Sequence, residues 1–248
     1  MSVSRRVVTG AAFAAGLFRA APLAAQIAAA PPASAGEAAS DLRELVARYL
    51  AWRGGAALEQ LETLHERLYV ENPDGSRAPG QRWVDREGRT RREIDRPDGR
   101  ETHIATPDGA WRIGADGHVA DDPGAYERAR RFAALEFGDA FRGRGGAVVA
   151  SAPATDVNDH TWAVIHIGFG DADIYDALID APTGALGGYV ITEAGAGRTL
   201  LFGDWRRIDG VRAPFAQLTK AEALSEVRLT VVELNRPIDP ALFARPSG

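Results

Sequence analysis

The chain has 248 residues, of which 45% are hydrophobic and 25% charged, with 27 Gly, 14 Pro and no Cys. This composition is typical of a globular protein and excludes a disordered or collagen-like chain. The absence of Cys excludes disulfide bonds, thiolate zinc sites and a cysteine nucleophile. No apolar run of about 18 residues follows the N-terminal segment, which excludes a multi-span membrane protein.

Residues 1–35 have the pattern of an export signal. Arg5-Arg6 precede an apolar, Ala-rich stretch over 7–30, and Ala33-Ser34-Ala35 forms a small-residue cleavage site. The adjacent arginines favour the twin-arginine route, with general secretion as the alternative. Cleavage would leave a single domain, 36–248, with a net charge of −8, which disfavours nucleic acid as a partner. We therefore expect a periplasmic protein of a Gram-negative bacterium, with no transmembrane segment in the mature chain.

The mature chain then reads as a helix, a meander, a second helix and further strands. Residues 41–53 carry apolar side chains at helical spacing, and Gly54-Gly55 ends that helix. Acidic-Gly pairs at 87, 98, 108 and 116 are typical of hairpin turns and predict an antiparallel meander. Asp122-Pro123 predicts the start of a second helix that ends near Gly143. Alternating residues predict further strands between 147 and 234.

Several of the later strands are apolar on both faces. In the strand predicted over 161–168, Ile165 and Ile167 alternate with Trp162 and Val164. A sheet with one face in water would alternate apolar with polar residues, so both faces of this strand need a cover. A filled sandwich core would provide it, and so would a curled sheet around an apolar cavity. The pattern leaves both interpretations open.

The sequence contains no recognisable catalytic or metal-binding motif. The five His residues form neither H-x-H nor H-E-x-x-H, and there is no G-x-S-x-G elbow, P-loop or dinucleotide fingerprint. We therefore expect no catalytic residue, metal or cofactor; the alternative is an enzyme built around His103 or His166. Nine Arg and seven acidic residues share 77–112, which favours cross-strand ion pairs. Within that segment, Arg91 is the candidate for contact with a ligand headgroup.

Two segments of the C-terminal half carry a resemblance to a known family. Residues 202–215 read FGDWRRIDGVRAPF, and residues 231–243 read VVELNRPIDPALF. This arrangement resembles the superfamily of periplasmic lipoprotein carriers related to LolA and LolB, which includes outer-membrane lipoprotein-sorting proteins. The resemblance implies a mainly β (α+β) fold: an incomplete, strongly curved antiparallel β-barrel of about eleven strands, with two or more helices covering its open side. It does not extend to lipoprotein sorting itself.

These observations together predict a non-catalytic carrier or sensor. Its partner would be a lipid or lipoprotein acyl chain, or another apolar small molecule, bound in the barrel cavity. The residues expected to line the cavity are Trp83, Ile94, Ile104, Trp111, Trp162 and Phe202. The alternative is a cell-envelope protein-interaction or scaffold module with a filled core, no ligand and an exposed apolar patch.

Overall fold

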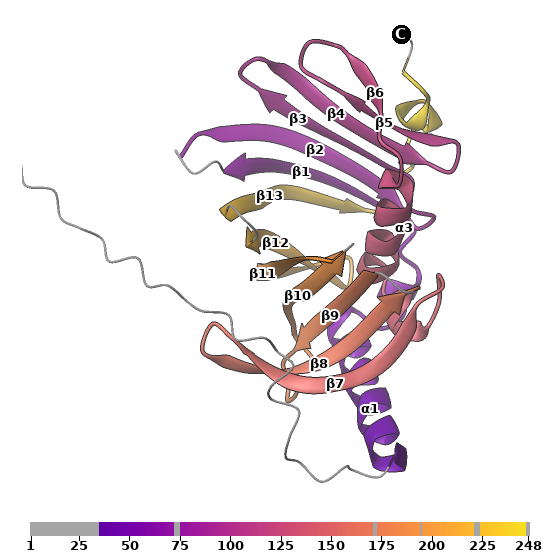
Figure 1. Cartoon of the computed structure of the whole chain (residues 1–248), viewed down its shortest axis with the longest axis vertical. Coiled ribbons are helices and arrows are strands. Elements are labelled where there is room, and N and C mark those ends of the chain that lie inside the picture. The colour runs from indigo at the N-terminus through magenta and orange to yellow at the C-terminus, as the bar shows by residue number, and fades with distance from the viewer. Residues whose placement is uncertain (1–34, 72–74, 171–172, 194, 221–223, 247–248) are drawn as a thin grey trace, which may run out of the picture.

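The protein forms one antiparallel sheet that curves around two helices (Figure 1). The computed structural model describes residues 35–71, 75–170, 173–193, 195–220 and 224–246. The predicted export signal lies outside these residues except for Ala35, and so does most of the predicted turn at 72–75.

The sheet has thirteen strands in the order β6-β5-β4-β3-β2-β1-β13-β12-β11-β10-β9-β8-β7. The strands are β1 (Thr63–Glu71), β2 (Arg77–Asp85), β3 (Thr90–Arg96), β4 (Gly99–Thr106), β5 (Gly109–Ile113), β6 (Val119–Asp121), β7 (Val148–Val157), β8 (His160–Phe169), β9 (Asp173–Ile179), β10 (Leu186–Glu193), β11 (Ala196–Ile208), β12 (Val211–Lys220) and β13 (Leu224–Leu234).

The predicted fold class is confirmed, with one correction to its details. The sheet has thirteen strands and not about eleven, partly because β6 has three residues and no apolar alternation to reveal it. The sheet is open, as predicted for an incomplete barrel, because its end strands β6 and β7 do not pair with each other. The acidic-Gly pairs do separate consecutive strands, and Gly88 and Gly117 have φ of 87° and 80°, as such turns require.

Within the described residues, three α-helices and two short 3-10 helices accompany the sheet: α1 (Ala35–Arg53), α2 (Ala56–Glu59), α3 (Ala125–Glu136), η2 (Ala140–Arg142) and η3 (Pro240–Phe243). Helix α1 begins six residues before the expected cap Asp41. Helix α3 begins after Pro123 and not at it, because Gly124 has a left-handed conformation, with φ 83°, that a helix cannot contain. It ends before Gly138, at φ 73°, and not near Gly143.

We call the sheet face that α1 and α3 cover the inner face (Figure 1). Two apolar clusters fill it. The first joins α3 to β1, β2 and β13 through residues such as Phe137, Leu64 and Val232. The second joins α1 and α3 to β8, β9 and β10 and includes Tyr49 and Ile165, neither of which is exposed. The helices therefore hold the two ends of the curved sheet together from within.

The two edges of the open sheet are both interrupted or short. In β7, the register against β8 shifts between Ala152 and Thr155, at the position of Pro153. At the other edge, β6 pairs with β5 over only three residues. No helix within the described residues is both long and apolar enough to cross a bilayer.

Candidate functional site

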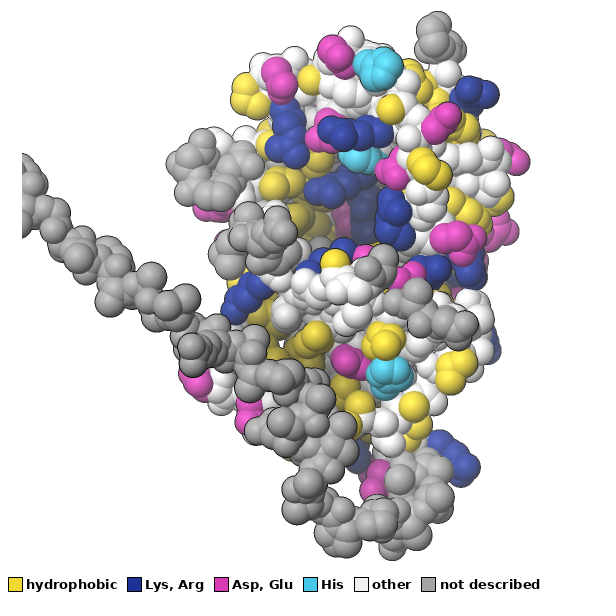
Figure 2. All heavy atoms as spheres, viewed as in Figure 1, with side chains coloured by type: hydrophobic (Ala, Val, Ile, Leu, Met, Phe, Trp, Pro, Cys, Tyr) yellow, Lys and Arg dark blue, Asp and Glu magenta, His cyan; other side chains and the backbone are white. Residues whose placement is uncertain are grey.

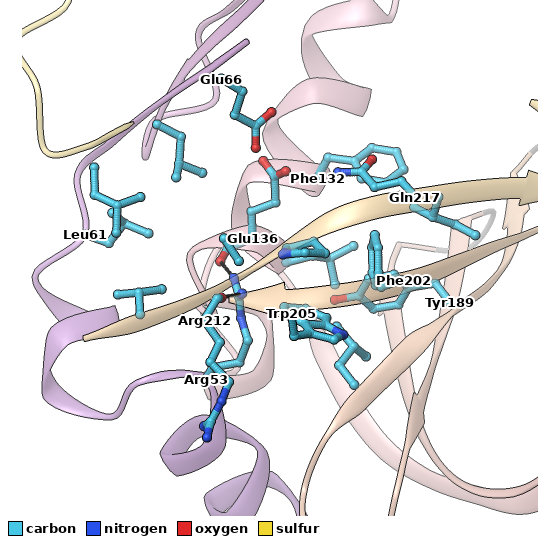
Figure 3. Close-up of a pocket in the computed structure, with 18 of the residues that line it drawn as sticks. Arg53, Leu61, Glu66, Phe132, Glu136, Tyr189, Phe202, Trp205, Arg212 and Gln217 are labelled. Carbon is cyan, nitrogen blue, oxygen red and sulfur yellow. Dashed lines mark hydrogen bonds between the residues drawn. The ribbon is translucent and has the colours of Figure 1, made fainter. Parts of the chain in front are cut away.

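A cavity of about 180 Å³ lies on the inner face, between the two apolar clusters. Most of its lining is apolar or aromatic, and five of the lining residues are charged (Figure 3). The lining residues are Tyr49, Arg53, Leu61, Leu64, Glu66, Arg82, Phe132, Leu135, Glu136, Leu186, Tyr189, Leu200, Phe202, Trp205, Val211, Arg212, Ala213, Pro214, Gln217 and Leu234. A cavity of about 150 Å³ holds benzene, so this one accommodates a ring or a short stretch of alkyl chain.

Aromatic rings form one wall of the cavity. Phe202 packs edge-on against Tyr189 and Trp205, with ring centroids 5.8 and 5.7 Å apart. Regular alternation would place Phe202 and Trp205 on opposite faces of β11. Asp204 lies between them with φ 49°, which interrupts the alternation and brings both rings to the same cavity.

A buried charge cluster forms the opposite wall. The Arg82 guanidinium donates to Glu66 Oε2 at 2.8 Å and to Glu136 Oε1, and the two carboxylates point towards one another (Figure 3). Burial raises the pKa of the Glu136 carboxyl above its usual range, against the opposing effect of Arg82. Burial lowers the pKa of Arg82, but Glu136 and Glu66 outweigh it and raise that pKa overall. Arg82 therefore stays charged and holds both carboxylates in place.

Two arginines, Arg53 and Arg212, fix the C-terminal end of α1 to the residues that line the cavity. Arg53 donates to the backbone oxygens of Arg212 and, at 2.8 Å, Glu136. Arg212 donates to the backbone oxygen of Trp52 and lies 5.2 Å above its ring. These contacts satisfy carbonyls at the ends of α1 and α3, where no intrahelical donor reaches. Burial also raises the pKa values of the Tyr49 and Tyr189 phenols, which stay neutral in the lining.

A second hollow, of about 230 Å³, lies towards β5 and has the lining residue Arg82 in common with the cavity. Strand register aligns four basic residues directly across from each other here: Arg82 with Arg92, Arg92 with His103, and His103 with Arg112. We call these four residues the basic row. In Figure 2, dark blue side chains gather around a hollow in the upper half of the molecule.

Of the residues that the sequence places in the cavity, the structure brings Phe202 to the lining. Trp83, Ile104 and Trp111 align across the strands with Arg91. Each neighbours a residue of the basic row in sequence, so these side chains point to the outer face. Ile104 and Trp111 also border the second hollow.

The short helix η3 packs against β3 and β4, next to this group on the outer face. The Arg91 guanidinium donates to the backbone oxygen of Leu242 at 3.0 Å and to Glu93 Oε1 at 2.6 Å, and Phe243 of η3 is buried nearby. The structure does not place Arg91 at the cavity. Its predicted contact with a ligand headgroup stays a prediction.

The two remaining candidates lie elsewhere. Ile94 is buried on the inner face, within the first apolar cluster but outside the cavity lining. Trp162 points to the outer face and covers Gly187, where a Cβ would lie 2.2 Å from the Trp162 ring. A binding role for these two residues is likewise untested.

The charged part of the site was not predicted from the sequence, although a signal for it exists. Glu66 occupies a core-face position between Leu64 and Leu68 on β1, and Glu136 interrupts the apolar face of α3. A charge at a position that periodicity assigns to the core marks a buried ion pair or a site. Trp205 was missed because alternation places it opposite Phe202.

The histidines considered for catalysis lie outside the cavity lining. His103 belongs to the basic row and contacts Glu101 at 3.1 Å. His166 lies on the outer face and contacts Asp176 at 2.7 Å. Within the described residues there is no group of three or more His, Cys, Asp or Glu placed to hold a metal ion.

Comparison with solved structures identifies the fold. A LolA superfamily protein from Nitrosomonas europaea matches 84% of this chain and 97% of its own, with 11% identity and a TM-score of 0.54. A candidate outer membrane lipoprotein-sorting protein domain from Vibrio parahaemolyticus matches 84% and 96%, with 11% identity and a TM-score of 0.50. A DUF1329 family protein from Desulfovibrio piger matches 84% and 97%, with 9% identity and a TM-score of 0.57.

No protein-family model and no curated protein sequence matches the chain. At identities of 9–11%, the likeness concerns the fold. It spans 84% of the chain. The resemblance read from the sequence is confirmed at this level: the chain has the fold of LolA superfamily proteins.

Proposed function

We propose that the protein is a non-catalytic periplasmic carrier or sensor that takes the apolar end of a lipid, or another apolar molecule, into the inner-face cavity. The observation that carries this proposal is the cavity itself, which leaves a mostly apolar space between two otherwise packed clusters. Burial of each methylene group contributes about 0.8 kcal/mol, so apolar contact alone gives useful affinity.

The chemistry of the lining supports binding without catalysis. Among the described residues, the cavity lining contains no Ser, Thr, His or Lys that could act as nucleophile or general base. Its carboxylates Glu66 and Glu136 are both bound to Arg82. The structures that share the fold include one named for outer membrane lipoprotein sorting, which agrees with a lipid-handling role.

Export belongs to the same proposal. Residues 1–35 form a cleavable signal, and the mature domain is 36–248. N-terminal sequencing of the protein from a periplasmic extract tests this: we expect a chain that begins at Gly36. A chain that retains Arg5 and Arg6, or that remains in the cytoplasmic fraction, would contradict it.

A chain-length series tests binding in the cavity. Calorimetric titration with neutral monoacylglycerols of increasing chain length should show affinity rising about fourfold per methylene over the first carbons. Ala213→Leu fills the cavity, where Ala213 is 6% exposed, and should weaken binding. Ala120→Leu on exposed β6 is the matched control and should bind as the wild type does.

The opposite results would favour an interaction module. If folded wild-type protein binds no member of the series, the cavity is not a binding site and the proposal fails. The same holds if Ala213→Leu and Ala120→Leu bind alike, because the ligand would then lie elsewhere. Mass spectrometry of a solvent extract from protein purified without detergent would identify the natural cargo.

A further inference from the structure

The strongest unassigned feature of the inner face is an arginine that no carboxylate neutralises. Within the described residues, Arg92 has no hydrogen bond or ion pair, although it lies in the hollow beside the cavity. The neighbouring acids are engaged elsewhere. Glu66 and Glu136 bind Arg82, while Glu101 binds Arg112, His103 and Arg96.

The side of the hollow next to α3 also offers Arg92 no free carboxylate. There, Arg128 of α3 bonds to Asp122 at 3.0 Å, so this carboxylate is also taken. Arg82 lies directly across the strand pair from Arg92, and Glu66 and Glu136 are both paired with it.

Arg92 is exposed, so the hollow presents an unpaired positive charge to a ligand that approaches from solvent. An anion bound at Arg92 would compensate this charge and accept hydrogen bonds from the guanidinium. Since Arg82 lines both hollows, an anion at Arg92 lies about one strand spacing, ~4.8 Å, from the wall of the apolar cavity. The two hollows thus lie at a separation that one amphiphilic molecule spans.

We propose that the inner face binds anionic amphiphiles, with the oxyanion headgroup at Arg92 and the alkyl chain in the cavity beyond Arg82. The inference rests on the proposed function and adds a ligand class to it. Phosphate and carboxylate headgroups share the chemistry that Arg recognises: two anionic oxygens that accept parallel hydrogen bonds from the planar guanidinium.

The test compares three probes with one alkyl chain: dodecyl phosphate, dodecanoate and neutral dodecylglycerol, each titrated below its micelle concentration. Wild-type protein should bind at least one anionic probe about tenfold tighter than dodecylglycerol. The preference should fall as salt increases, because the contact is electrostatic. The stronger of the two anionic probes distinguishes a phosphate from a carboxylate headgroup.

Substitutions locate the headgroup. Arg92→Gln should abolish the anionic preference and leave dodecylglycerol affinity unchanged, since the alkyl chain lies elsewhere. Arg92→Lys should restore part of the preference. Arg100→Gln is the matched control: it removes the same charge from the neighbouring strand, on the outer face, where Arg100 binds Asp95 at 2.6 Å, and it should retain the preference.

The outcomes separate the two proposals. If dodecylglycerol binds but the anionic probes bind no tighter, the headgroup site is wrong and the cavity stands. If the preference exists but survives Arg92→Gln, the anion binds at another residue and the inference is overturned. If no probe binds to folded protein, the proposed function fails together with the inference.

Discussion

Two rows of side chains on the inner face show how differently its two halves are built. In one half, Ile165, Ala177, Tyr189 and Leu200 lie directly opposite one another across β8 to β11, and the first two are fully buried. In the other half, the basic row crosses β2 to β5 and opens to a hollow. The cavity lies between them and takes Tyr189 and Leu200 from one row and Arg82 from the other.

The difference shows that one curved sheet can combine a half with a packed apolar core and a half with charged side chains beside an open hollow. Helices α1 and α3 complete the apolar core over β8 to β10. Along the basic row, charged side chains take the place of apolar packing, although Ala78, Val84 and Ile94 of β2 and β3 belong to the first apolar cluster. Ion pairs between charged side chains stabilise a fold less than burial does, but they leave polar groups at a surface that a ligand reaches. The predictions below test whether the two halves differ energetically as they do structurally.

The largest effect is expected from Arg82→Gln. The change leaves Glu66 and Glu136 facing each other without a cation, and loss of one partner from a buried ion cluster costs about 3–5 kcal/mol. Urea unfolding at neutral pH measures it. Glu136→Gln alone should cost far less, because burial already disfavours the charge of Glu136. Equal losses for the two variants would contradict this account of the cluster.

A smaller loss is expected from Asp139→Asn. Asp139 accepts two hydrogen bonds from Arg86, at 2.8 and 2.9 Å, which lower its carboxyl pKa despite the raising effect of burial. A lowered native pKa stabilises the fold above the unfolded value, about 3.9, and this contribution is lost as pH falls through the native pKa. We expect the variant to lose about 2 kcal/mol at pH 7.

The pH dependence provides the control for Asp139. The difference in unfolding free energy between wild type and Asp139→Asn should shrink as the pH falls below about 4. A difference that stays constant down to acid pH would mean that the carboxylate charge contributes nothing. The loss at pH 7 would then come from packing alone.

Ile165→Val should cost about 1 kcal/mol in the apolar half, the usual result of removing one methylene from a packed core. Ile165 is fully buried between β7 and β9. Ile104 on the outer face, 2% exposed, offers a matched Ile→Val control in the charged half. A similar loss at both would show that η3 packs the outer face as tightly as the helices pack the inner one.

The smallest effect is expected from Arg92→Gln on stability. Arg92 is exposed and has no ion-pair partner among the described residues, so its loss should change the free energy of unfolding by no more than about 0.5 kcal/mol. Thermal unfolding without ligand measures this. A large loss would reveal a structural role for Arg92 and would weaken its use as a probe of binding.

Local patterns predicted much of the fold. Acidic-Gly pairs marked the turns of the meander because glycine alone adopts their backbone angles readily, and the strand predicted over 161–168 lies within the observed β8, His160–Phe169. The paired C-terminal segments led to the correct fold. Strand β6 was not predicted because it has only three residues, too few to show a periodic pattern. The start of α3 was misplaced because it depends on the backbone angle of one glycine, Gly124.

The site was less predictable because it depends on which face each residue occupies. Arg91 and Arg92 differ by one position, yet one contacts Leu242 on the outer face and the other lies in the inner hollow. A strand alternates with a period of two, so an error of one residue reverses the assignment. Phe202 and Trp205 meet only because Asp204 breaks that period. No sequence pattern predicted this interruption of the alternation in β11.

The interrupted edges of the sheet bear on how copies of the protein behave at high concentration. An open sheet exposes unpaired N–H and C=O groups at both ends, and long regular edges of this kind template aggregation. Pro153 cannot donate a hydrogen bond and lies where β7 loses register, and β6 is three residues long. Neither edge offers a long, continuous row of backbone hydrogen-bonding groups to a strand of another copy. The sheet can therefore stay open without promoting the growth of fibres.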